Sequence, residues 1–194
     1  MRERRFAAAF LRGLAWAALL SLGVILLVRC APEAARRGIL HGEAYRVEMF
    51  GWIETGVGRE NDWRAFLPQH LLHLGAFALL AWGSGGYLGL VLGAALTGYM
   101  SYFVGSFAVA SGAPITGALA AWVPWSVVRV VAFVALGTVL ARPALVGRWF
   151  ALERQDRRWI LGAAIGILID LAVKASCAPG YGRFLRGLLE AGAP

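Results

Sequence analysis

The chain is poor in charge and in the residue types that catalysis and metal binding use most. Of its 194 residues only 15% are charged, and it has one lysine, three histidines and two cysteines. Soluble domains carry about 25% charged residues, so a soluble globular protein is not expected. It also lacks a glycine-rich loop ending in lysine, which excludes the usual phosphate-binding loop of nucleotide hydrolases.

Long apolar runs are what the sequence has instead. Hydrophobic residues make up 59% of the chain, and the mean hydropathy is +0.65. A helix that crosses a bilayer needs ~20 mostly apolar residues. Five stretches qualify: 10–28, 66–83, 86–110, 117–141 and 159–177. The sequence therefore predicts an all-α polytopic membrane protein, a bundle of five transmembrane helices forming one integral membrane domain over residues 1–194.

The arginines indicate an orientation for this bundle. The net charge is +8, but the basic residues flank the spans instead of gathering on one soluble face, so nucleic-acid binding is not expected. Arginine and lysine are enriched in cytoplasmic loops. Arginine clusters precede the first span and fill the 142–158 connection. We expect a protein of the cell (inner) membrane, with the N-terminus in the cytoplasm and the C-terminus outside.

The longest connection, residues 29–65, is expected on the outer side. Apolar residues recur in it at helical spacing, and its aromatic rings are of the kind that lie at the headgroup level. We predict one amphipathic extracytoplasmic segment, a helix over about Ile39–Thr55, in contact with the lipid bilayer surface. Its candidate partner-docking residues are Leu40, Tyr45, Val47, Phe50 and Trp52.

The third span carries small residues four apart. They are Gly85, Gly89, Gly93, Thr97, Ser101 and Gly105. Such a row makes a smooth groove in which a neighbouring helix approaches closely. Packing of the chain's own helices is favoured, and a homodimer is the alternative.

A charged residue, Arg129, lies within the apolar fourth span. It stands 12 residues from Ala141, about 18 Å into a ~30 Å hydrocarbon core. A charge there costs ~2.5–3.5 kcal/mol even on the gentlest scale, so it needs a partner. Asp170 in the fifth span lies 12 residues from Arg158 and reaches the same depth. We predict an Arg129–Asp170 ion pair, with Lys174 one turn further out and extending toward the surface.

The functional alternative to a structural clamp is a proton or ion relay. A relay needs a chain of titratable groups, and the other spans offer no third group at this depth. The clamp is therefore favoured.

The remaining candidates for chemistry are few. His70 and His73 share a helix face, but no acid accompanies them, so neither a metal nor another cofactor is expected. Ser111 lies in Ala-Ser-Gly, which resembles the motif of rhomboid proteases, yet no histidine follows His73 to act as its base. Cys30 and Cys177 could form a disulfide, although two unrelated cysteines are the simpler interpretation. No enzyme is predicted.

Several segments together resemble the stage II sporulation protein M family. These are the lead Trp63–His70, the Leu-Gly93-Ala-Ala-Leu-Thr-Gly98 stretch, the Trp122–Gly137 segment with Pro124, and the end of the last span at Ile167–Asp170. The likeness covers nearly the whole chain. Many members carry glutamates at about the places that Arg129 and Asp170 occupy here.

The resemblance implies a non-enzymatic membrane scaffold that anchors cell-wall (peptidoglycan) hydrolases resembling stage II sporulation proteins D and P. In sporulating relatives this serves septal wall remodelling and engulfment. Residues 39–64 would dock the partners, with Arg183–Arg186 as a second contact. The alternatives are the membrane component of an ABC-type export system, contacted by an ATPase at 142–158, and an inactive rhomboid-like intramembrane serine protease.

Overall fold

The structure, a computed structural model, describes residues 2–145 and 154–192, and the side chains of 6–141 and 156–192. These residues form eight helices and no strand. The helices are α1 (Arg2–Cys30), α2 (Pro32–Gly38), α3 (Gly42–Thr55), α4 (Trp63–Gly83), α5 (Tyr87–Ala110), α6 (Pro114–Ala121), α7 (Pro124–Leu145) and α8 (Arg154–Gly192). Five of them, α1, α4, α5, α7 and α8, are long and apolar enough to cross a membrane, which confirms the five-helix prediction.

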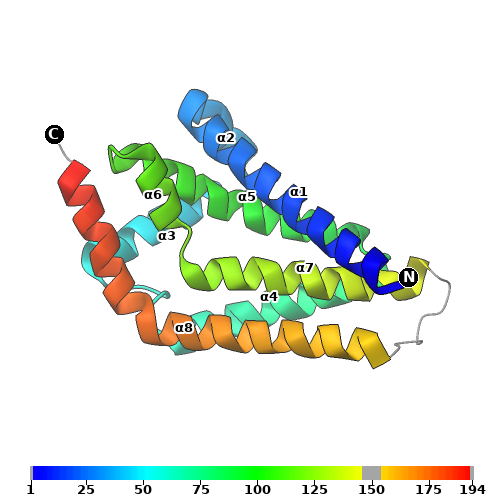
Figure 1. The fold of residues 1–194 in the computed structure, drawn as a ribbon. Helices are drawn as coiled ribbons and strands as arrows, with labels where there is room; N and C mark the ends of the chain where they lie inside the picture. Colours follow the sequence, from blue (N-terminus) through cyan, green and yellow to red (C-terminus); the bar gives the residue numbers. More distant parts are fainter. Residues whose placement is uncertain (1, 146–153, 193–194) are drawn as a thin grey trace.

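The long helices run side by side and the short ones gather at one end (Figure 1). α7 packs against α8 and α4, while α1 lies on α5. The N-terminus, the end of α7 and the start of α8 share one end of the bundle, and α2, α3, α6 and the end of α8 lie at the other. We call these the N-terminal end and the cap end. The arginines at 2–5 and 142–155 have side chains outside the described residues.

The fourth span differs from its predicted range, 117–141. The helix is interrupted at Trp122 and Val123, and the apolar span is Pro124–Ala141. Proline disfavours helical conformation in the residue before it and lacks an N–H to donate. α6 is consequently a separate short helix at the cap end, and Arg129 stands in the second turn of α7.

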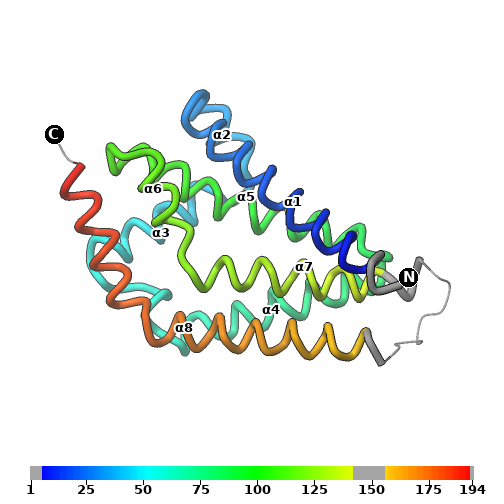
Figure 2. Tube along the Cα trace, in the orientation of Figure 1, coloured from blue at the N-terminus to red at the C-terminus, as the bar shows by residue number. Residues whose placement is uncertain are grey.

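The last helix is longer than predicted. α8 does not end near Cys177 but continues through Pro179 to Gly192, so that the whole helix has 39 residues, about 58 Å at the usual helical rise. Figure 2 shows that it bends and lays its final part across the cap end. There the Tyr181 hydroxyl donates to the Ala120 carbonyl at 2.8 Å, and Arg186 Nε donates to the Ile53 carbonyl at 2.8 Å.

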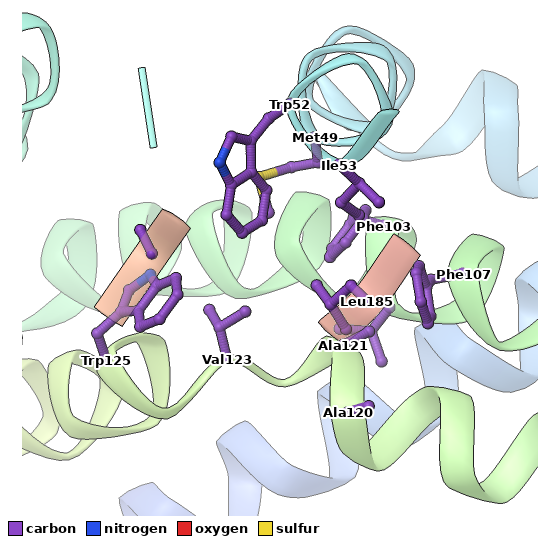
Figure 3. Close-up of a cluster of buried hydrophobic side chains, with 12 residues drawn as sticks. Met49, Trp52, Ile53, Phe103, Phe107, Ala120, Ala121, Val123, Trp125 and Leu185 are labelled. Carbon is purple, nitrogen blue, oxygen red and sulfur yellow. The ribbon is translucent and has the colours of Figure 1, made fainter. Parts of the chain in front are cut away.

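The main apolar core lies at the cap end (Figure 3). Its side chains come from α3, α5, α6, α7 and α8 and include Met49, Trp52, Ile53, Phe103, Phe107, Trp125 and Leu185. α3 is therefore a packed part of the bundle. One of the expected docking residues, Trp52, is only 1% exposed and is not accessible to a partner. Tyr45 and Phe50 are partly buried and pack their rings against Phe103.

The row of small residues seats the chain's own helices. A Cβ at Gly89 would lie 2.7 Å from Ala81 Cβ on α4, and one at Gly105 would lie 3.2 Å from Ile25 Cα on α1. Gly93 faces Phe77 of α4, and Thr97 and Ser101 are buried between these contacts. Gly85 differs from the expectation because it lies in the turn before α5, with φ +64°.

Candidate functional site

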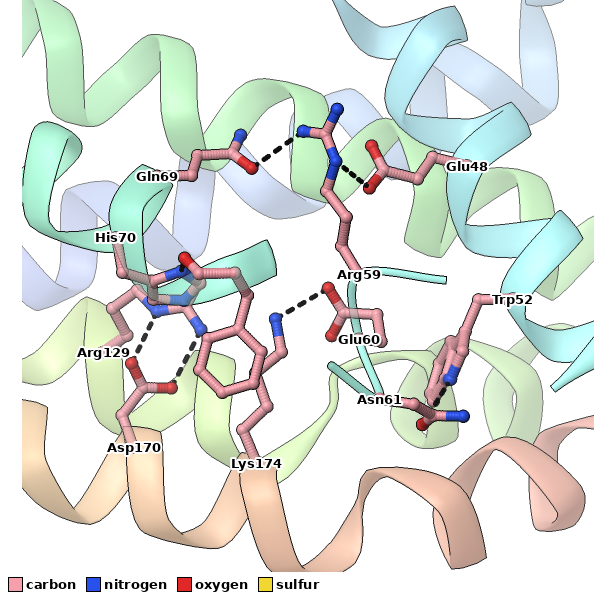
Figure 4. Close-up of polar contacts among 11 residues, drawn as sticks. Glu48, Trp52, Arg59, Glu60, Asn61, Gln69, His70, Arg129, Asp170 and Lys174 are labelled. Atoms are coloured by element: carbon pink, nitrogen blue, oxygen red, sulfur yellow. Dashed lines mark hydrogen bonds and ion pairs between the residues drawn. The ribbon is translucent and has the colours of Figure 1, made fainter. Parts of the chain in front are cut away.

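Arg129 and Asp170 form the central pair of a buried charge cluster. Arg129 Nε donates to Asp170 Oδ2 at 2.8 Å and Nη2 donates to Oδ1 at 2.9 Å. The planar guanidinium fork matches the two carboxylate oxygens, which makes this a geometrically specific contact between α7 and α8. The Asp170 side chain is 1% exposed. Figure 4 shows the pair with its surroundings.

Lys174 does not extend to the surface as expected. It lies one turn along α8 from Asp170, is 2% exposed, and places Nζ 2.8 Å from Glu60 Oε1. The same ammonium lies 4.3 Å from the centroid of the Phe66 ring on α4. An ammonium over an aromatic face is attracted by the ring's negative quadrupole, so Lys174 has an ionic and an aromatic partner.

Glu60 reaches the cluster because the α3–α4 connection folds inward. Gly56 ends α3 in the left-handed conformation, with φ +71°. Asn61 then accepts a hydrogen bond from Trp52 Nε1 at 2.9 Å, and the Asp62 carboxylate caps α4 by accepting from Arg64 N. These contacts fix both sides of Glu60, which is itself buried. We call residues 56–62 the strap.

Arg59, the residue before Glu60, fastens the strap from its exposed side. Its guanidinium lies 3.4 Å from a Glu48 carboxylate oxygen on α3 and donates to Gln69 on α4 at 3.0 Å. The strap therefore bridges α3, α4 and α8.

His70 is the fifth polar residue of the cluster. Its Nδ1 lies 2.8 Å from the Phe66 carbonyl oxygen. A carbonyl only accepts, so Nδ1 carries the proton and Nε2 presents a lone pair. That Nε2 is buried and has no hydrogen-bond partner among the described residues. His73 is half-buried, and across the described residues no three His, Cys, Asp or Glu are placed to hold a metal.

The cluster balances its charges. Arg129 and Lys174 are offset by Asp170 and Glu60. Buried ion pairs of this kind fix which helix faces meet, and breaking one leaves an uncompensated charge. The sequence could not supply Glu60 as a member, because it is one of six acids in the 29–65 connection and nothing in the pattern singles it out. The only signal in the sequence was its single lysine, Lys174, whose ammonium would need an acidic partner if it were buried.

Ser111 and the cysteines lie outside this cluster. Ser111 is buried, and its Oγ contacts are the carbonyl oxygens of Ala108 at 3.3 Å and Ala113 at 3.5 Å. A carbonyl oxygen is not a base that could activate a serine nucleophile. The end of α8 also packs on this turn at Gly192. Cys30 and Cys177 are both free and exposed, so the alternative of a disulfide is wrong.

No protein-family model, curated protein or solved structure matches this chain.

Proposed function

We propose that this chain is a non-enzymatic membrane scaffold that anchors and localises cell-wall hydrolases, as in septal wall remodelling and engulfment during sporulation. The likeness of residues 63–70, 93–98, 122–137 and 167–170 to the stage II sporulation protein M family motivates this choice. An all-helical bundle with five apolar helices is compatible with it. The partners would be exported enzymes resembling stage II sporulation proteins D and P.

The observation that supports the proposal best is the exposed side of α3. Leu40 is 70% exposed and Val47 is 57% exposed, and Ala44 lies exposed between them. Ala44 and Val47 are three apart on α3 and share one apolar face, and we group Leu40 of the preceding turn with them as one apolar stripe. We call it the α3 stripe. Exposed apolar patches commonly mark interaction surfaces, and this one retains two of the five docking residues expected from the sequence.

Hydrogen bonds at the cap end fix the position of α3, which keeps the stripe on the outer side of the helix. Arg186 of α8 donates to the Ile53 carbonyl near the end of α3, and the Tyr102 hydroxyl of α5 donates to Glu43 in its first turn at 3.0 Å. With its inner face in the core, α3 would bind a partner with little reordering. A preorganised surface loses less conformational entropy on binding.

Site-specific photocrosslinking in the host's own membranes tests the proposal. A photoreactive residue at Leu40 or Val47 should capture an exported peptidoglycan hydrolase, identified by mass spectrometry and by wall-cleaving activity of the captured complex. Leu72 on α4 provides the matched control, because it is 69% exposed within a membrane-spanning helix and should capture lipid instead.

Two other results would contradict the scaffold. Capture of a cytoplasmic ATPase by residues 142–158 would favour an export component; residues 146–153 of that stretch lie outside the described part of the chain. Labelling of Ser111 by a fluorophosphonate would favour an intramembrane serine protease.

A further inference from the structure

α6 is the uncharged element of the cap end. No Asp, Glu, Lys or Arg occurs between Arg64 and Arg129, and within α6 the only polar side chain is that of Thr116. By contrast α2, α3 and the end of α8 each carry acids and arginines. A helix that faces water usually has charged or polar residues on its outward side, whereas one that is apolar all round is buried in protein or in a membrane.

The protein covers only one side of α6. Gly117, Ala120 and Ala121 are buried and lie on the packed side. Ile115 is 78% exposed and Leu119 is 72% exposed. Because these two residues are four apart, their side chains lie together on the opposite side of the helix. An apolar helix that is half covered by protein has the membrane as its other apolar surroundings.

Close packing sets α6 beside the last turn of a membrane-spanning helix (Figure 1). A Cβ at Gly117 would lie 3.0 Å from Ala108 Cα on α5, so a glycine is needed for this approach. Ala108 belongs to the apolar span Tyr87–Ala110. Val109, the next residue of that span, is 56% exposed. The exposed apolar surface of α5 therefore continues to the level of α6.

The end of α8 holds both ends of α6. The Tyr181 hydroxyl donates to the Ala120 carbonyl at 2.8 Å, near the last residue of α6. In the turn before α6, Gly112 has φ +64°, and a Cβ there would lie 3.2 Å from the Gly192 carbonyl oxygen. α6 is thus fixed between α5 and the end of α8, and its exposed side cannot turn inward without breaking these contacts.

We propose that the exposed side of α6 is a lipid-contacting surface, on which Ile115 and Leu119 pack against the acyl chains of the leaflet at the cap end. The lack of charge selects acyl chains over a water-soluble partner, because both side chains would face water whenever such a partner is absent. α6 also lacks the charged groups of the polar rim that protein interfaces carry. The proposal does not depend on the scaffold function.

Fluorescence quenching in phosphatidylcholine vesicles tests this surface. Cys30→Ser and Cys177→Ser first remove the two cysteines, both of which are exposed. Ile115→Cys or Leu119→Cys, in the otherwise full chain, then carries a bimane label. At a high ratio of lipid to protein, we expect brominated acyl chains to remove most of the fluorescence of either label. Iodide in the water should leave both labels bright.

Two further labelled positions calibrate the quenchers. Leu72→Cys is the control for lipid contact, since Leu72 is 69% exposed on the membrane-spanning α4, and brominated chains should quench it as strongly as the α6 labels. Arg183→Cys is the matched control for water, because Arg183 is an exposed charged position on the end of α8. Iodide should quench this label, and brominated chains should not.

Iodide quenching of the α6 labels to the extent seen at Arg183→Cys would place that side of α6 in water and overturn the proposal. Protection of both α6 labels from both quenchers would also overturn it. Crosslinking between Leu119→Cys chains would then assign the surface to a second copy of this chain. Circular dichroism and the unfolding temperature of each labelled variant establish that it is folded, so that quenching reports on the native surface.

Discussion

Arg129 and Asp170 are joined by two parallel hydrogen bonds, of 2.8 Å and 2.9 Å, between α7 and α8. A single-point ion pair would tolerate rotation of either helix, but the paired contact requires one register. One turn further along α8, Lys174 binds Glu60 of the strap. The two pairs together join α7, α8 and the α3–α4 connection. We interpret the intramembrane arginine as an architectural residue for this reason.

The Arg129–Asp170 pair should show strong coupling in a double-mutant cycle. Arg129→Ala and Asp170→Ala should each lower the free energy of unfolding by about 3–5 kcal/mol, because each leaves a buried charge unpaired. The double variant should cost clearly less than the sum, measured by unfolding in detergent micelles. Arg129→Lys should lower the free energy of unfolding by less than Arg129→Ala does, since an ammonium keeps the charge but cannot form the two parallel hydrogen bonds of the guanidinium. Additive losses would show that the pair does not stabilise the fold.

Glu60→Gln should loosen the strap. It leaves the Lys174 ammonium buried without its counter-charge, at a cost of about 3–5 kcal/mol. Hydrogen exchange at residues 56–62 should accelerate, and adding Lys174→Met should restore most of the protection. The control is Arg59→Gln. Its ion pair with Glu48 has side chains 54% and 35% exposed, and exposed pairs contribute about 0–1 kcal/mol. Slow exchange in Glu60→Gln would mean that Asn61 and Asp62 suffice to hold the strap.

Two glycine-to-alanine changes should have opposite signs. At Gly89 the new Cβ would lie 2.9 Å from Ala81 Cα, so α4 and α5 must separate, and overpacking of this kind costs about 1–3 kcal/mol. At Gly75 no heavy atom lies within 4 Å of the new Cβ, and alanine gains up to about 1 kcal/mol in helix propensity. Unfolding temperatures of the two variants, measured side by side, check the contrast. An unchanged unfolding temperature in Gly89→Ala would show that α4 and α5 make their close contact elsewhere.

Glu43 should make the attachment of α3 sensitive to acid. The hydrogen bond from Arg46, together with the one from the Tyr102 hydroxyl, lowers the pKa of Glu43 below its usual value. Because the folded state prefers the carboxylate, this stabilisation is complete above the unfolded pKa and is lost as pH falls through the folded one. The stability advantage of the wild-type chain over Glu43→Gln should therefore shrink on acidification. An advantage that grows as pH falls would contradict this sign.

The sequence was most informative where apolar surroundings left a residue little choice. Arg129 and Asp170 are charges in long apolar runs at matching depth, so their pairing followed from the cost of burying either alone. The small-residue row likewise indicated close helix packing, which Gly89 and Gly105 provide.

It was least informative where tertiary contacts override local pattern. Trp52 was expected at the membrane surface and in contact with a partner, because its segment is amphipathic. In the structure the bent end of α8 packs over the face of α3 that carries Trp52. The last span was predicted to end at residue 177, yet α8 continues through Pro179 and makes contacts with α6 and α3. Lys174 was expected to reach the surface, since no local feature showed that the strap would fold inward.

The measurement that tests the scaffold most directly is the amount of peptidoglycan hydrolase that copurifies with the chain when the α3 stripe carries a charge. The account predicts that Val47→Asp, an exposed position on α3, removes most of the hydrolase while the variant folds and reaches the membrane at the wild-type level. The control is Arg37→Glu, which changes a charge at an exposed position of α2 outside the stripe, and this variant should retain the enzyme. Undiminished hydrolase in the Val47→Asp preparation, or none in the wild type, would contradict the proposed function.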